Sequence, residues 1–267
     1  MKMNELVVAA IQSRIYSRKE ETINKIEEQI RRAKDLGAEI VCLPERWNYF
    51  KGIIDEDSEE IDGLSNTSLS KIAKNLEIYI IGGAIWQKLN DKYIISSSFF
   101  NPKGERIGIQ QKQHLYLFER ECFERAQDLN IFETELGKIG ILICFDMTFP
   151  ETPRKLALKG ADILFTPVMI RSDGIENWHL YLQTRALENR IPVVGVNIVG
   201  RMPEKNYGGE SMIIDFKRGH ISPSKLCIMK AKKDEEDIII KKIDLEFCRK
   251  LRKIRLNERL DSDNHLI

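Results

Sequence analysis

The chain has 267 residues, of which 42% are hydrophobic, and a formal net charge of +1. This length is sufficient for one large α/β domain with a substantial core. A charge so close to zero gives no electrostatic reason to expect binding to nucleic acid or to an anionic membrane. The apolar run after Glu5 is too short for a signal peptide, and no later run reaches the roughly 18 residues of a membrane span. We therefore expect a soluble, cytoplasmic protein.

The cysteines and histidines argue against structural disulfides and metal sites. The five cysteines are odd in number and widely spaced, without a CxxC pair, and the four histidines have no metal-binding spacing. No phosphate-binding loop, dinucleotide-binding glycine motif or GxSxG motif occurs either. We expect the protein to use its own side chains, without a cofactor or a metal.

The chain begins with the pattern of a β-α-β unit. Residues 6–11 form an apolar strand, and residues 17–20 form a capping box. Apolar residues then recur at helical spacing as far as Gly37, which favours a helix end. A second strand over residues 39–43 ends at Pro44-Glu45, so a carboxylate lies at the edge where α/β proteins tend to form sites.

The middle of the chain predicts one more helix and several hairpins. The acidic segment 55–62 is expected to be a solvated loop. A helix is predicted over 69–76, a strand broken by two glycines over 78–86, and hairpins over 93–100 with 106–111 and over 131–134 with 139–144. The first hairpin places Lys112 at the end of its second strand.

The second half of the chain repeats the pattern of the first. Residues 36–44 and 159–167 both read as a helix end, a glycine, a buried strand and a proline. We infer two related β-α-β layers, each with helices on one face, and so an α/β fold built as a four-layer α-β-β-α sandwich. The repeat is short, and two unrelated β-α-β units can also produce it.

The remainder predicts further elements of the same domain. These are a helix over 178–189, a strand over 193–199, a hairpin of 208–216 with 219–222, a solvated charge run over 230–237 and a strand over 238–243. Residues 245–267 are expected to form a C-terminal helical arm that packs on the domain or on a second subunit. Because no linker is recognisable, residues 1–267 are interpreted as one domain.

A cysteine lies at a strand-to-helix corner. The buried strand 140–143 ends at Cys144, and Pro150 is suited to the first turn of a helix, which Asp146 is expected to cap. Backbone N–H groups at such a corner are unpaired, favour thiolate over thiol and can hold an anion. This geometry is typical of a nucleophile with an oxyanion site, although a buried structural cysteine has the same pattern.

Glu45, Lys112 and Cys144 each follow a predicted strand, and together with their neighbours they resemble the Glu-Lys-Cys triad of the nitrilase superfamily, the carbon–nitrogen hydrolases. Singly, the glutamate and the lysine would be read as surface residues. The resemblance extends from about residue 6 to residue 221 and includes four blocks in the order of the family: residues 43–45, residues 112–115 with 119–121, residues 140–146 with 150–151, and residues 185–190.

The resemblance implies a cysteine-based mechanism. Cys144 would attack an amide carbonyl and form a thioester. Glu45 would take the thiol proton and pass it to the leaving amine. Lys112 and the backbone N–H of Phe145 would stabilise the oxyanion.

Two neighbouring residues have competing interpretations. Glu121 matches the family's second glutamate, which orients Lys112 and the substrate, but Glu119 is two positions away and Glu121 can also be a surface helix residue. His114 could form a papain-like pair with Cys144, but that would need an orienting partner and another chain order. We expect His114 to make a structural hydrogen bond instead.

The substrate is less well indicated. Phe145-Asp146 follows the cysteine where true nitrilases have Trp-Glu, which argues against nitriles. In relatives the loop after residue 167 faces the pocket, so Met169 and Arg171 are candidate substrate contacts. Arg171 could bind a substrate carboxylate with both arms of its guanidinium, or could be a solvated loop residue. Tyr49 is a candidate pocket wall.

We therefore expect a cofactor-free hydrolase that cleaves the C–N bond of a small, carboxylate-bearing amide and releases ammonia. By resemblance it would form at least a homodimer. The alternatives are an N-carbamoyl amino acid amidohydrolase, which also releases carbon dioxide, a nitrilase, and a non-catalytic binding module.

Overall fold

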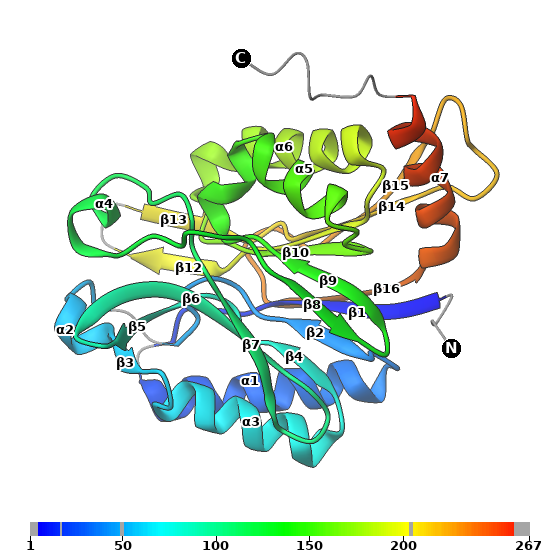
Figure 1. The fold of residues 1–267 in the computed structure, drawn as a ribbon. Helices are drawn as coiled ribbons and strands as arrows, with labels where there is room; N and C mark the ends of the chain where they lie inside the picture. Colours follow the sequence, from blue (N-terminus) through cyan, green and yellow to red (C-terminus); the bar gives the residue numbers. More distant parts are fainter. Residues whose placement is uncertain (1–4, 17, 49–50, 203–204, 259–267) are drawn as a thin grey trace.

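The computed structural model describes residues 5–16, 18–48, 51–202 and 205–258. Two β-sheets pack face to face, and helices cover the outer face of each sheet (Figure 1). The predicted α-β-β-α sandwich and single domain are therefore confirmed. Among the described residues, no helix is long and apolar enough to cross a membrane.

The larger sheet is built mainly from the first half of the chain. Its strand order is β16-β1-β2-β4-β6-β5-β3, and β7 also pairs with β6. The strands are β1 (Glu5–Gln12), β2 (Ile40–Cys42), β3 (Glu59–Glu60), β4 (Tyr79–Ile81), β5 (Ile85–Leu89), β6 (Lys92–Phe100), β7 (Arg106–Gln111) and β16 (Asp237–Asp244).

The smaller sheet belongs to the second half and has the order β15-β14-β11-β10-β9-β8. Its strands are β8 (Ile131–Thr134), β9 (Gly137–Ile141), β10 (Ile163–Pro167), β11 (Val193–Val196), β14 (Met212–Phe216) and β15 (Leu226–Lys230). A separate two-stranded sheet joins β12 (Val199–Met202) to β13 (Lys205–Gly208).

Helices α1 (Lys19–Asp35) and α3 (Leu64–Leu76) cover the larger sheet, and α5 (Glu151–Leu158) and α6 (Ile175–Asn189) cover the smaller one (Figure 1). The remaining helices are α2 (Ile54–Asp57), α4 (Glu119–Cys122), α7 (Leu245–Asn257) and the 3₁₀ helices η1 (Cys144–Thr148) and η2 (Ser172–Gly174). Helix α1 buries Ile26, Ile30 and Ala33, which recur every three or four residues and so lie on one face.

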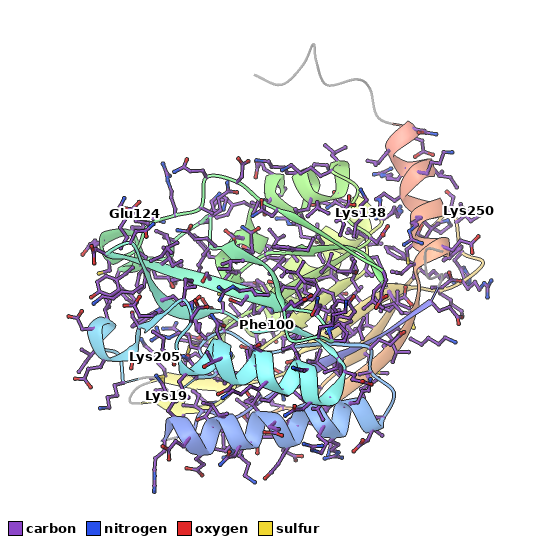
Figure 2. All side chains as sticks on the ribbon, turned by 60° about the horizontal axis from the view of Figure 1, so that its bottom comes forward. Lys19, Phe100, Glu124, Lys138, Lys205 and Lys250 are labelled. Atoms are coloured by element: carbon purple, nitrogen blue, oxygen red, sulfur yellow. The ribbon has the colours of Figure 1, made fainter. Side chains whose placement is uncertain are left out.

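The alternation of side chains along β1 divides the interior into two layers. Leu6, Val8 and Ala10 belong to the core between the sheets. Ala9 and Ile11 point the other way, into the core beneath α1 and α3. This is the two-residue period of a strand that is buried on both faces. Figure 2 shows how apolar side chains such as Phe100 fill the interior, while charged ones such as Lys250 project outward.

The predicted repeat between the two halves corresponds to equivalent structural units. Gly37 after α1 and Gly160 after α5 both have φ of +92°, which favours glycine at a helix end. Strand β2 then lies between parallel β1 and β4, and strand β10 lies between parallel β9 and β11. Two β-α-β layers are therefore present, as the repeat predicted.

Two local predictions were wrong. Segment 55–62 is not a plain solvated loop, because it contains α2 and β3 and buries Asp57 and Glu59. Both carboxylates are held by local partners: Asp57 accepts the backbone N–H of Gly52, and Glu59 accepts that of Ser65. Residues 219–222 form no strand, and β14 pairs with β15 further along the chain.

The C-terminal helix packs on the smaller-sheet side of the domain. Helix α7 buries Cys248 and Leu251. Asp162, which precedes β10, receives two hydrogen bonds of 2.8 Å from Arg249 of α7. Burial alone would raise the pKa of Asp162, but the hydrogen bonds from Arg249 and from the Lys138 backbone hold it below its usual value. The arm therefore packs on its own domain as far as the structure describes it.

Candidate active site

Three strand ends bring the predicted triad residues together. Glu45 follows β2, Lys112 follows β7 and Cys144 follows β9. All three are buried, with exposed fractions of 3%, 1% and 9%. The Lys112 ammonium lies 3.0 Å from Glu45 Oε1, and all three residues line one cavity of about 420 Å³.

The corner at Cys144 is strained. Strand β9 ends at Ile141, and Cys144 begins η1 with φ of +46°, a conformation that residues other than glycine rarely adopt. Such strain persists only where the surroundings impose it, and it is concentrated at functional sites. The Asp146 carboxylate imposes it in part, because it accepts the backbone N–H of Ile143 at 3.0 Å.

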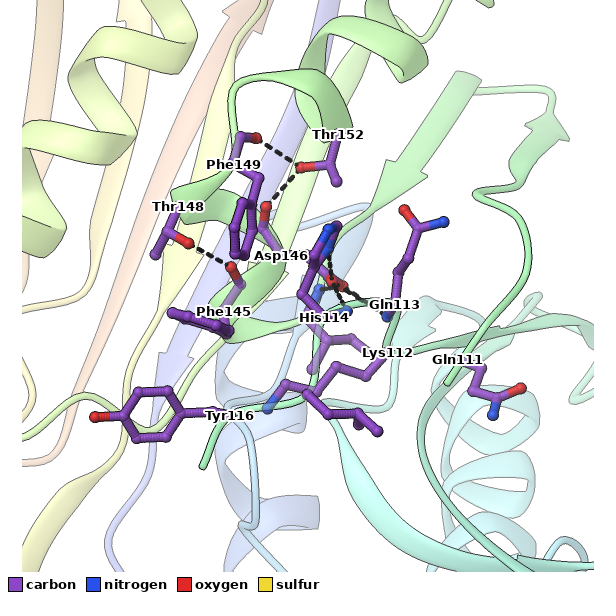
Figure 3. Close-up of polar contacts among 12 residues, drawn as sticks. Gln111, Lys112, Gln113, His114, Tyr116, Phe145, Asp146, Thr148, Phe149 and Thr152 are labelled. Carbon is purple, nitrogen blue, oxygen red and sulfur yellow. Dashed lines mark hydrogen bonds and ion pairs between the residues drawn. The ribbon is translucent and has the colours of Figure 1, made fainter. Parts of the chain in front are cut away.

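The sequence predicts that Asp146 caps α5, and this prediction is wrong. The Asp146 side chain instead joins two loops of the site. Its fully buried carboxylate accepts the backbone N–H groups of Gln113 at 3.1 Å and His114 at 2.7 Å (Figure 3). The His114 ring lies 3.1 Å from the same carboxylate and stacks on Phe149. One aspartate therefore fixes the cysteine corner to the segment that follows Lys112, and His114 makes the structural hydrogen bond that we expected.

A close backbone approach positions Glu45. The backbone N–H of Glu45 donates to Val168 in the other half of the molecule, and the N–H of Arg46 donates to Ala84. Gly83 has φ of +67°, and a Cβ at this position would lie only 2.1 Å from the carbonyl oxygen of Pro44. Only glycine therefore fits against the turn that carries Glu45.

The carboxylate that contacts Lys112 from α4 is Glu119, which corrects the expectation for Glu121. Glu119 is buried, and its carboxylate oxygens lie 2.9–3.0 Å from Lys112 Nζ. It also accepts the backbone N–H of Tyr116 at 2.7 Å. Glu121 is exposed. Helix α4 is one short turn, and residues two positions apart face different sides of a helix.

Lys112 and the carboxylates around it shift one another's pKa values. Burial alone would lower the pKa of Lys112, but Glu45, Cys144 and Glu119 raise it above its usual value, which favours the charged ammonium. Burial raises the pKa of Glu119, and Lys112 opposes this effect.

The surroundings of Cys144 favour the thiol over the thiolate. Burial and the charge of Glu45 raise its pKa well above its usual value, although Lys112 and a hydrogen bond with the backbone of Met169 act in the opposite direction. Burial thus opposes the preference for thiolate that the sequence predicts at this corner, and a base that removes the proton as the sulfur attacks would overcome this effect.

The other predicted contacts differ in position. Met169 and Arg171 both line the cavity. The exposed Arg171 guanidinium is held by Asp173 through two hydrogen bonds of 3.0 and 2.7 Å. Phe145 also lines the cavity, and Tyr49 lies outside the described residues.

Arg46 and Tyr207 are among the cavity residues that sequence reasoning missed. An arginine after a glutamate reads as surface, and Tyr207 lies far from the other blocks in the chain, so neither had a sequence signal. In the part of the chain that the structure describes, no group of three or more His, Cys, Asp or Glu residues is arranged to hold a metal ion.

Comparisons with known proteins identify the family of this chain. Residues 7–253 match the family model described as carbon-nitrogen hydrolase. The chain is 32% identical to omega-amidase NIT2 of Xenopus tropicalis over 248 residues, which cover 88% of this chain and 87% of that protein. It is 27% identical to N-carbamoylputrescine amidase of Oryza sativa subsp. japonica, with 91% of this chain and 87% of that protein covered.

A solved structure extends the similarity to the whole fold. Nit3 of Saccharomyces cerevisiae, described as a member of branch 10 of the nitrilase superfamily, superimposes with a TM-score of 0.84 at 26% identity. The match covers 99% of this chain and 98% of that one. The chain belongs to the carbon–nitrogen hydrolase family of the nitrilase superfamily. It is therefore a carbon–nitrogen hydrolase with an α-β-β-α fold.

Proposed function

We propose that this hydrolase is a cysteine amidase, which releases ammonia from a small amide that also carries a carboxylate. The observation that carries the proposal is the buried cluster of Glu45, Lys112 and Cys144, which opens into one cavity. A nucleophile, a base and a fixed cation are the groups that acyl transfer from an amide requires.

In the first half of the reaction, Sγ of Cys144 bonds to the carbonyl carbon while Glu45 takes the thiol proton. The raised pKa of the Cys144 thiol supports this assignment, because the sulfur needs a base at the moment of attack. The tetrahedral intermediate then collapses, the C–N bond breaks, and Glu45 returns the proton to the leaving amine. A thioester and ammonia result.

In the second half, Glu45 takes a proton from water, and the resulting nucleophile attacks the thioester. The C–S bond breaks, a carboxylic acid leaves and the thiol is restored. In both halves, Lys112 stabilises the oxyanion together with the backbone N–H of Phe145. Its ammonium stays charged and is held between two carboxylates, so it needs no rearrangement as charge develops.

The substrate proposal rests on the cavity and on the relatives. A volume of about 420 Å³ suits a metabolite-sized ligand. Outside the Glu45–Lys112–Glu119 cluster, the charged cavity residues are three cations (Arg46, Arg171 and Lys205) and one acid, Asp173, so the remaining wall favours an anion. Similarity to a protein named omega-amidase supports the same class.

An N-carbamoyl amino acid amidohydrolase is the second candidate, supported by the similarity to a protein named N-carbamoylputrescine amidase. Its reaction would begin with the same attack by Cys144 but would release carbon dioxide as well as ammonia. The ratio of the two products therefore separates the candidates.

The test is ammonia release by the wild type and by Cys144→Ala with succinamate, glutaramate, N-carbamoyl-β-alanine, an uncharged aliphatic amide and a nitrile. We expect Cys144-dependent ammonia from an ω-amide acid and no carbon dioxide. Equal ammonia and carbon dioxide from the carbamoyl compound alone would favour the second candidate. Turnover by Cys144→Ala would refute the nucleophile.

We also propose that the protein is a homodimer. Helices α5 and α6 carry the exposed apolar side chains Leu158 and Leu180, which a second copy could cover. Light scattering after gel filtration should give about twice the chain mass of 31.0 kDa. A mass of one chain at micromolar concentration would contradict this proposal.

A further inference from the structure

Arg46, the residue directly after Glu45, is a buried cation on the cavity wall. Its exposed fraction is 8%, and it lines the same cavity as Cys144. The central carbon of the guanidinium lies 3.2 Å from the centroid of the Trp86 ring, and this stacking fixes the plane of the group. A planar, oriented guanidinium is suited to binding a carboxylate through two parallel hydrogen bonds.

Arg46 also donates a hydrogen bond to a local acid, Asp57. The distance between Arg46 Nη2 and Asp57 Oδ2 is 3.4 Å. The same carboxylate accepts two shorter hydrogen bonds of 2.8 Å from the backbone of Lys51 and Gly52. Burial lowers the pKa of Arg46 to about 9 although Glu45, Asp57 and Glu119 act to raise it. Burial therefore disfavours the charged guanidinium, and an anion in the cavity would oppose this effect.

Tyr207 supplies a hydroxyl on the same cavity. Tyr207 belongs to β13, which lies far along the chain from β2, and only 6% of the residue is exposed. Burial raises the pKa of Tyr207, while the charges of Arg46 and Arg171 lower it. Within the described ranges, no hydrogen bond to this hydroxyl is present. A phenol near a guanidinium can donate a further hydrogen bond to a carboxylate.

Arg171, the other cavity arginine, is less suited to this role. Its guanidinium is exposed, and Asp173 already holds it through the two-armed contact that a substrate carboxylate would need. A substrate would have to displace Asp173 and compete with water. Arg46 is buried, so water competes less for its guanidinium.

We propose that the Arg46 guanidinium and the Tyr207 hydroxyl form the subsite that receives the carboxylate of the substrate while its amide group lies at Cys144. This inference rests on the proposed amidase function and names the residues that select an ω-amide acid over a neutral amide. The arginine sets the preference through its charge, and the tyrosine contributes one directed hydrogen bond.

The experiment compares kcat/KM for glutaramate with that for pentanamide, a neutral amide of the same chain length. We expect the wild type to prefer glutaramate. Arg46→Met keeps an unbranched side chain on Trp86 but removes the charge, and should lower the ratio of the two values about 10- to 150-fold. Tyr207→Phe should lower the same ratio about 2- to 12-fold.

Controls separate recognition from general damage. Arg31→Met, an exposed arginine of α1 that pairs with Glu27, should leave the ratio unchanged. Arg46→Lys keeps the charge without the planar fork and should fall between the wild type and Arg46→Met. If Arg46→Met does not fold, Arg46→Lys and Tyr207→Phe still measure the preference.

Three results would overturn the subsite. In the first, Arg46→Met lowers both kcat/KM values equally. In the second, Arg171→Met rather than Arg46→Met lowers the ratio. In the third, the wild type hydrolyses pentanamide as well as glutaramate, and the amidase proposal then stands without the subsite. Failure of the wild type to hydrolyse pentanamide or any amide of the panel above would instead refute the amidase proposal, and the subsite with it.

Discussion

Replacing Glu119 by glutamine tests how the site holds its lysine. The Lys112 ammonium is almost completely buried and lies 2.9–3.0 Å from both oxygens of Glu119. Glutamine keeps the size of the side chain and can still accept a hydrogen bond, so the variant removes mainly the charge.

The size of the effect follows from the burial of this contact. A hydrogen bond to a charged partner contributes about 1.5–3 kcal/mol, and each ~1.4 kcal/mol is a factor of ten in rate. If Glu119 holds Lys112 for oxyanion stabilisation, Glu119→Gln should lower kcat/KM about 10- to 150-fold. Because Lys112 acts on the developing oxyanion, most of this loss should be in kcat and not in KM.

Glu121→Gln is the matched control, because Glu121 lies on the same short helix and is exposed. An exposed substitution of this kind changes stability by about 0.5 kcal/mol or less, and we expect kcat/KM to stay within about twofold of the wild type. The measurements are kcat and KM from steady-state ammonia release, together with thermal unfolding, for the wild type, Glu119→Gln and Glu121→Gln. A large loss with Glu121→Gln and none with Glu119→Gln would refute the assignment of Glu119.

Three further variants test the supports of the site and of α7. Gly83→Ala should lower the free energy of unfolding by about 1–3 kcal/mol in denaturant titration, since its Cβ would meet the Pro44 carbonyl; unchanged stability would contradict the close approach. Asp146→Asn should reduce both stability, by about 2–4 kcal/mol, and ammonia release, because an amide cannot accept all the N–H groups that the carboxylate now accepts; normal activity would exclude its role at the corner. Asp162 has a lowered pKa, so its pairing with Arg249 should stabilise the fold above about pH 4 and lose effect as the pH falls below that value. The melting temperature of Asp162→Asn should therefore be lower than that of the wild type at pH 7 and approach it in acid, and an equal difference at every pH would contradict the linkage.

The fold was predictable because its patterns are regular. The unbroken apolar run of β1 reflects burial on both faces of the strand, and the spacing of Ile26 and Ile30 in α1 reflects burial on one face of the helix. The predictions failed in segments whose structure depends on contacts with residues elsewhere in the chain. Segment 55–62 reads as solvated because its partners, such as Arg46 for Asp57, are not recognisable as such in the sequence.

The candidate site was predictable at its strand ends but not at its loops. Glu45, Lys112 and Cys144 each follow the end of a strand, and strand ends meet at one edge of an α/β fold. Which of Glu119 and Glu121 faces Lys112 depends on the orientation of the single helical turn α4. The sequence does not indicate this orientation, because both positions are glutamate. Asp146 was misassigned because its partners come from the loop after β7, about 30 residues earlier in the chain.

The most direct test of the account is the covalent intermediate on Cys144. The wild type would be mixed with glutaramate, quenched in acid within the first turnovers, and analysed by intact mass and peptide mapping. The account predicts a mass increase of the substrate acyl group on the peptide that contains Cys144, formed with release of one ammonia and absent from Cys144→Ala. Turnover by Cys144→Ala, or acylation of another of the five cysteines with full activity, would contradict it.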